Sequence, residues 1–143
     1  MFNPSRDQVR QFFCAAWQKY CAQQPLLGAE VSAAEIAARH PEYHKLLAHP
    51  DLAMQQEWRP EGGQMNPFLH LSLHLAIHEQ ISIDQPPGIR AAFAALCERM
   101  ERHAAEHVIL ECLGETLWRA QSSGTSLDAP AYLEAIERAA RAD

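Results

Sequence analysis

The most apolar stretch of the chain is FLHLSLHLAIHEQI, which follows Asn66 and Pro67 and ends near Ile83. Asparagine is a preferred cap for the first turn of a helix, and proline suits the first helical position. Apolar residues recur here at the three- and four-residue spacing of a helix, and the turn DQPPG (84–88) must end it. The stretch therefore predicts a helix that is buried over most of its surface.

The rest of the chain shows the same periodicity in other segments. Ser5 and Gln8 form a capping-box pattern, which predicts a first helix over about 5–23. Prolines and glycines separate further predicted helices over 29–39, 41–48, 51–57, 87–100, 102–121 and 128–141, and 59–65 is a predicted loop. No stretch shows the sustained alternation of a β-strand. We predict an all-α fold, an irregular antiparallel bundle of about five to seven helices in one domain, 1–143.

The charge of the chain excludes two classes of partner. The 143 residues have a formal net charge of -6, and the 12 lysines and arginines are scattered rather than clustered. Binding to nucleic acid or to an anionic membrane surface depends on a cluster of basic side chains. We therefore expect neither of these partners, whereas the sequence leaves a homo-oligomer open.

The cysteines and the N-terminus predict the compartment. The segment MFNPSRDQVR lacks the apolar core of a signal peptide, and no apolar run reaches the roughly 18 residues of a membrane span. Cys14, Cys21, Cys97 and Cys112 form no C-x-x-C unit and fall inside helical patterns. Such cysteines are typical of reduced, partly buried thiols. We predict a cytoplasmic protein.

Histidines recur at a spacing of four residues. The pairs are His40/His44, His70/His74, His74/His78 and His103/His107. Independent placement of the eight histidines would give roughly 0.4 such pairs. Residues i and i+4 lie one above the other on a helix, so the spacing predicts imidazoles that share a face.

Two of these pairs fall on the apolar face of their helix. His70 and His74 share a stripe with leucine and isoleucine, and so do His103 and His107, with Glu111 one turn further on. Buried imidazoles and carboxylates need partners, and a divalent cation bound by several of them meets that need. We therefore predict a buried metal site formed by His70, His74, His103, His107 and Glu111.

The other histidines are assigned either a secondary role at the metal site or none. His40 and His44 would complete a second metal position or line its entrance, although Pro41 separates them and His40 could equally cap a helix. His49 and His78 are interpreted as surface residues. Any of these histidines could also be an ordinary core residue with hydrogen-bonded nitrogens.

The types of ligand side chain limit which metal ion can bind and which reaction it can support. Imidazole with carboxylate suits iron, manganese or zinc, and without a thiolate cluster a cysteine–zinc or iron–sulfur site is excluded. An open coordination position would activate water against a small-molecule substrate, whereas full coordination implies storage or structure. The sequence His78-Glu79 begins an H-E-x-x-H motif, but Ser82 breaks it.

The alternative to a metal-binding protein is a metal-free interaction module. In that module the helix 29–39 or an exposed Trp58 docks a protein partner.

Four strings of the chain resemble a small bacterial family, a domain of unknown function with the number eighteen forty-one. They are MFNPSRDQVRQFF (1–13), HPEY (40–43), NPFLHLSLHLAIHEQISIDQPPGIRAA (66–92) and ECLGETLWRAQ (111–121), and the resemblance covers nearly the whole chain. The family's pattern is matched at Asn66, Pro67, His70, His74, Glu79, Gln80, Asp84, Gln85, Pro86, Pro87, Gly88, His107, Glu111 and Trp118. The resemblance implies no activity. It does add two candidates for the site. One is Asp84, and the other is Glu79, which is otherwise interpreted as an ion-pair or capping residue.

Overall fold

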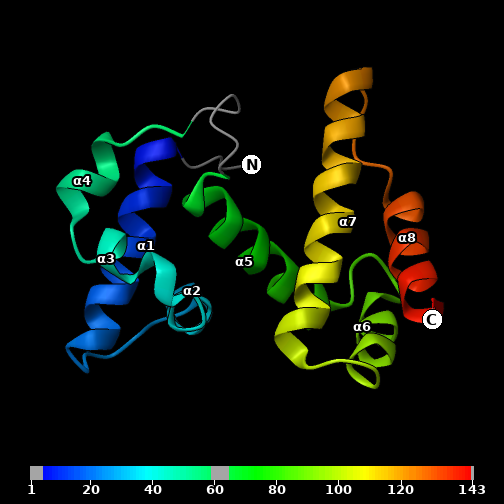
Figure 1. Ribbon diagram of the computed structural model, residues 1–143, viewed down its shortest axis with the longest axis horizontal. Helices are drawn as coiled ribbons and strands as arrows, with labels where there is room; N and C mark the ends of the chain where they lie inside the picture. The colour runs from blue at the N-terminus through cyan, green and yellow to red at the C-terminus, as the bar shows by residue number, and fades with distance from the viewer. Residues whose placement is uncertain (1–4, 59–64, 143) are drawn as a thin grey trace. The chain divides into compact units, whose positions relative to one another are not determined.

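A computed structural model describes residues 5–58 and 65–142 (Figure 1). Within these ranges the chain forms eight α-helices and one 3-10 helix, η1, and no strand. The elements are α1 (Arg6–Cys21), α2 (Ala29–Ala38), η1 (Pro41–Tyr43), α3 (His44–Leu47), α4 (Pro50–Gln55), α5 (Pro67–Ile83), α6 (Ile89–Cys97), α7 (Arg102–Ser123) and α8 (Ala129–Arg141).

The all-α prediction is confirmed, and the helices of the described ranges are slightly more numerous than the predicted five to seven. Of the predicted loop 59–65, residues 59–64 lie outside the described part of the chain. The chain divides into two compact units, Met1–Leu75 and Ala76–Asp143, and each is described by itself. Helix α5 begins in the first unit and ends in the second. A single domain over the whole chain stays a prediction.

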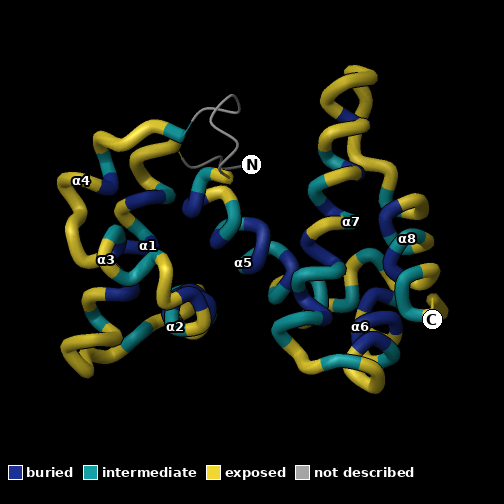
Figure 2. Tube along the Cα trace, in the orientation of Figure 1, coloured by how far each residue is buried: buried dark blue, intermediate teal, exposed yellow. Residues whose placement is uncertain are grey.

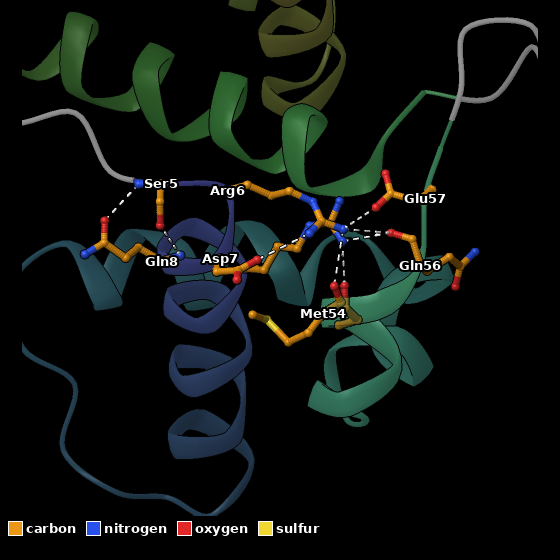
Figure 3. A network of polar contacts seen from close by, with 9 residues as sticks. Ser5, Arg6, Asp7, Gln8, Met54, Gln56 and Glu57 are labelled. Carbon is orange, nitrogen blue, oxygen red and sulfur yellow. Dashed lines mark hydrogen bonds and ion pairs between the residues drawn. The ribbon is translucent and has the colours of Figure 1, made fainter.

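The first unit begins with the predicted capping box. The hydroxyl of Ser5 accepts a hydrogen bond from the N–H of Gln8 at 3.1 Å, and the Gln8 side chain accepts from the N–H of Ser5 at 2.8 Å (Figure 3). These two bonds satisfy donors that the first turn of a helix otherwise leaves without an intrahelical acceptor. The start of α1 is therefore determined by residues three positions apart.

The core of the first unit lies between α1, α2 and the beginning of α5. Its buried members are Phe13, Cys14, Ala16, Trp17, Ala33, Ile36, Ala37, Leu47, Ala53, Phe68 and Leu71. Figure 2 shows α5 as buried or half-buried along much of its length. Ala33 and Ala37 of α2 belong to this core, so the side of the helix that carries them is covered.

A buried arginine joins α1 to the end of α4. Arg10 is 2% exposed, and its Nη1 donates hydrogen bonds of 2.8 Å to the carbonyl oxygens of Ala53 and Gln56. The guanidinium also lies over the rings of Trp58 and Phe68, 5.2 and 5.3 Å from their centroids. Trp58 is half-buried, so the expectation that it is exposed was wrong, whereas its role in docking a partner stays a prediction.

Arg6 binds the same end of α4 from the solvent side. Its Nη2 donates to the carbonyls of Met54 and Gln56 and forms a 2.7 Å ion pair with Glu57 (Figure 3). The terminal carbonyls of a helix have no intrahelical donors, so the two arginines supply the donors that α4 needs.

In the second unit α6, α7 and α8 pack against one another. Asp84 joins α5 to α6, because its Oδ1 accepts from the N–H groups of Gly88 at 3.2 Å and Arg90 at 3.0 Å. Gly88 has a φ of +105°, and a Cβ there would lie 3.3 Å from Leu133. The turn 84–88 is thus a helix connector, in which Asp84 supplies an acceptor for two N–H groups at the start of α6.

Tyr132 is the largest fully buried side chain described. Its hydroxyl donates a 2.6 Å hydrogen bond to the Oε1 of Gln80 near the end of α5. Burial raises the pKa of Tyr132, so the phenol keeps its proton and remains a donor at neutral pH.

Replacing Tyr132 by phenylalanine is expected to lower the free energy of unfolding by about 1–2 kcal/mol, because Gln80 loses its donor. Urea denaturation measures the change. Tyr20→Phe is the matched control, since Tyr20 is 47% exposed and its loss of a hydroxyl has little effect. Equal stabilities of the two variants would contradict this role of the hydroxyl.

Candidate metal centre

Helix α5 places three imidazoles one turn apart. Asn66 begins the helix, as predicted, because its Oδ1 accepts from the N–H of Phe68 at 2.8 Å. From that start His70, His74 and His78 follow at intervals of four residues and share one side of the helix. His70 and His74 belong to the first unit and His78 to the second.

His40 joins the first two imidazoles from a different part of the first unit. It lies between α2 and η1, is 2% exposed, and its Nδ1 is 2.7 Å from the carbonyl oxygen of Ile36. A carbonyl only accepts, so Nδ1 carries the proton and Nε2 presents a lone pair. The ring of Tyr43 stacks on His40, with centroids 5.5 Å apart and planes 5° from parallel.

The three imidazoles converge on one point. The Nε2 of His70 is 3.2 Å from the Nε2 of His40 and 3.2 Å from the Nε2 of His74. The ligand nitrogens of the three residues all lie within 4.8 Å of one another. His74 is fully buried and His70 half-buried. We call His40, His70 and His74 the histidine triad.

The spacing of the triad fits a coordinated ion. Two nitrogens bound tetrahedrally to zinc at about 2.0–2.1 Å lie about 3.3 Å apart, close to both measured contacts. The alternative is hydrogen bonding, but one proton on the Nε2 of His70 can be donated to only one of its two neighbours. A cation receives a lone pair from each ring, and the bond from Nδ1 of His40 to Ile36 orients the ring for it.

His44 and His49 have structural roles. The Nε2 of His44 donates to the carbonyl of Ala37 at 2.8 Å, and its ring stacks on Trp17 with centroids 4.2 Å apart. His44 therefore does not join the triad, because its nitrogen bonds to the end of α2 instead. His49 is exposed, as predicted, and its Nδ1 donates to the carbonyl of Lys45.

The second predicted pair lies on α7 in the second unit. The rings of His103 and His107 have centroids 4.4 Å apart, and both residues are half-buried. Glu111, expected on the same buried stripe, is exposed. The buried face of α7, which includes Ile109 and Leu113, is rotated by about one residue, or 100°, from the predicted face. The role of His103 and His107 as ligands stays a prediction.

Sequence reasoning missed the carboxylate that α7 does bury. Glu106 is 1% exposed, and its Oε1 lies 2.6 Å from the Nε2 of His78. The side chain of His78 is only 11% exposed, so its interpretation as a surface residue was wrong. Residues 103–107 spell H-x-x-E-H, a helical zinc motif that would have drawn attention to Glu106.

The fold and the site define an all-α protein with a buried histidine cluster. The chain belongs to the family described as a domain of unknown function (DUF1841), whose model matches residues 5–138. The resemblance of the sequence to this family is therefore confirmed. No curated protein and no solved structure matches the chain.

Two other candidates come from the family's pattern. Glu79 is exposed on α5, and its interpretation as an ion-pair or capping residue stays a prediction. The Oδ1 of Asp84 accepts from the N–H groups of Gly88 and Arg90 at the start of α6. Among the described helices none has the length and apolarity to cross a membrane.

Proposed function

We propose that the protein binds a divalent transition-metal ion through the histidine triad. The observation that carries the proposal is the pair of 3.2 Å contacts that the Nε2 of His70 makes with His40 and His74. The triad draws on two separate segments, the end of α2 and the first half of α5, so a bound ion would join them. Tyr43 and the carbonyl of Ile36 support the site by holding His40 in place.

The donor set favours particular metals. Imidazole suits zinc and iron, whereas manganese prefers oxygen donors, so zinc or iron is proposed ahead of manganese. Three neutral imidazoles leave the charge of the ion uncompensated and leave one position for a further ligand. That position favours an anionic oxygen, such as hydroxide from an activated water or the carboxylate of a small-molecule substrate.

We also propose a cytoplasmic location. The support is that all four cysteines are free thiols, namely Cys14, Cys21, Cys97 and Cys112. Two of them, Cys21 and Cys97, are also exposed. Free exposed thiols persist in a reducing compartment.

The expected result for protein purified without an affinity tag is bound metal that a chelator removes with a fall in melting temperature. A ligand that binds only the folded state stabilises it by about 4 kcal/mol at 1,000 times its Kd. Elemental analysis and thermal melts before and after chelation, followed by re-addition of Zn²⁺, make the measurement. Trace metal whose removal leaves the melting temperature unchanged would refute the proposal and favour the metal-free interaction module.

The affinity is also expected to fall with acidification, because protons compete with the ion for the imidazole nitrogens. Stabilisation by Zn²⁺ should therefore be large at neutral pH and vanish well below the usual pKa of histidine, about 6.5. Melting temperatures with and without Zn²⁺ across this range test the sign. A Zn²⁺-induced increase in melting temperature that persists at low pH would exclude imidazole ligands.

A further inference from the structure

A small pocket lies between α1 and the beginning of α5 in the first unit. It has a volume of about 210 Å³ and is lined by two arginines of α1, Arg6 and Arg10, and by residues of the first turns of α5 that include Leu69 and Ser72. At 100° per residue, Leu69 and Ser72 lie about 100° and 160° around the helix from His70. The pocket is therefore on a different side of α5 from the histidine triad.

The guanidinium of Arg10 has one edge that the protein does not use. Its Nη1 donates to the carbonyl oxygens of Ala53 and Gln56. Among the described residues none accepts a hydrogen bond from its Nε or Nη2. The N–H groups on these two nitrogens are parallel, and such a pair binds both oxygens of a carboxylate. Since Arg10 lines the pocket, this edge is available to a ligand there.

The positive charge of Arg10 is only partly compensated. Two carbonyl dipoles and two aromatic rings surround the buried guanidinium, but a buried charge is costly unless an opposite charge accompanies it. The carboxylates whose charges reach it, Glu57 and Asp7, form ion pairs with Arg6. Burial and the charge of Arg6 lower the pKa of Arg10, yet an arginine keeps its proton at neutral pH. An anion in the pocket would supply the missing charge.

The rest of the pocket is apolar or neutral. Val9, Phe68 and Leu69 provide apolar surface, and Ser72 adds a hydroxyl group. Apolar walls with a few polar groups are typical of small-molecule sites. We propose that the pocket binds a small organic carboxylate, with its two oxygens on the Nε and Nη2 of Arg10 and a short apolar group against Phe68 and Leu69. The site does not depend on the proposed metal site.

Titration of the isotope-labelled, full-length protein with benzoate tests the proposal. The readout is the Nε–H resonance of Arg10 in two-dimensional NMR spectra, which is assigned by its loss in Arg10→Lys. Benzoate is expected to shift this resonance in a saturable manner, whereas benzamide, a neutral molecule of the same shape, leaves it in place. Inorganic phosphate is expected to bind at least about tenfold more weakly, because it has no apolar group to bury. Equal effects of benzamide or phosphate would overturn the assignment of a carboxylate site.

Filling the pocket is expected to remove the binding without a change to Arg10. Leu69→Trp places an indole in the pocket, and the variant should fold because Leu69 is 50% exposed. Leu52→Trp is the matched control, since Leu52 is 49% exposed on α4 of the same unit, and it should keep the binding. His70→Ala should keep it too. Binding that survives Leu69→Trp would refute the site, and binding lost in His70→Ala would show that benzoate binds at the triad instead.

Discussion

Replacing His70 by alanine is expected to lower the affinity for Zn²⁺ by at least about 100-fold, because a ligand is lost. Loss of a group that only orients a ligand costs about 10- to 100-fold. His70 has this effect because its Nε2 lies 3.2 Å from both other nitrogens of the triad. The variant is expected to fold, since His70 is only half-buried whereas His74 is fully buried. Competition titration against a chromophoric chelator measures the affinity of the variant and of the wild type.

His49→Ala is the matched control for this experiment. His49 is an exposed histidine of the same unit, and its Nδ1 bonds to the carbonyl of Lys45 rather than to another imidazole. Its loss should leave the affinity unchanged. Unchanged affinity in His70→Ala as well would show that the triad is a hydrogen-bonded cluster and that metal binds elsewhere or not at all.

Replacing Arg10 by alanine lowers the free energy of unfolding by about 3–4 kcal/mol. The variant loses two 2.8 Å hydrogen bonds from a charged group, each worth about 1.5–3 kcal/mol, and the contacts with Trp58 and Phe68. Arg10→Lys keeps the charge but not the planar group that serves two carbonyls, so an intermediate loss is expected. Chemical denaturation of the metal-free protein measures both changes.

The control for Arg10 is provided by the same end of α4. Arg6 binds neighbouring carbonyls and Glu57, but its side chain is 46% exposed. Arg6→Ala should cost less than about 1 kcal/mol, as exposed ion pairs do. Equal losses in the two alanine variants would contradict the argument that burial makes the Arg10 bonds strong.

The sequence by itself determined the helices, their starts and the pairing of His70 with His74. Ser5 and Asn66 cap α1 and α5 through bonds to residues two or three positions away, so the pattern needs no tertiary information. The two imidazoles of α5 come together for the same reason, since residues four apart share a helix face.

Only the tertiary structure decided which further side chains meet these helices. His40 reaches His70 across 30 positions of sequence, and no periodicity encodes that contact. Helix α7 has apolar residues on several sides, so its sequence does not determine which face is buried. In the folded protein Glu106 is buried, whereas Glu111 and Trp118 are exposed. The physical reason is that spacing along a helix fixes which residues share a face, whereas packing against other helices selects the face that is buried.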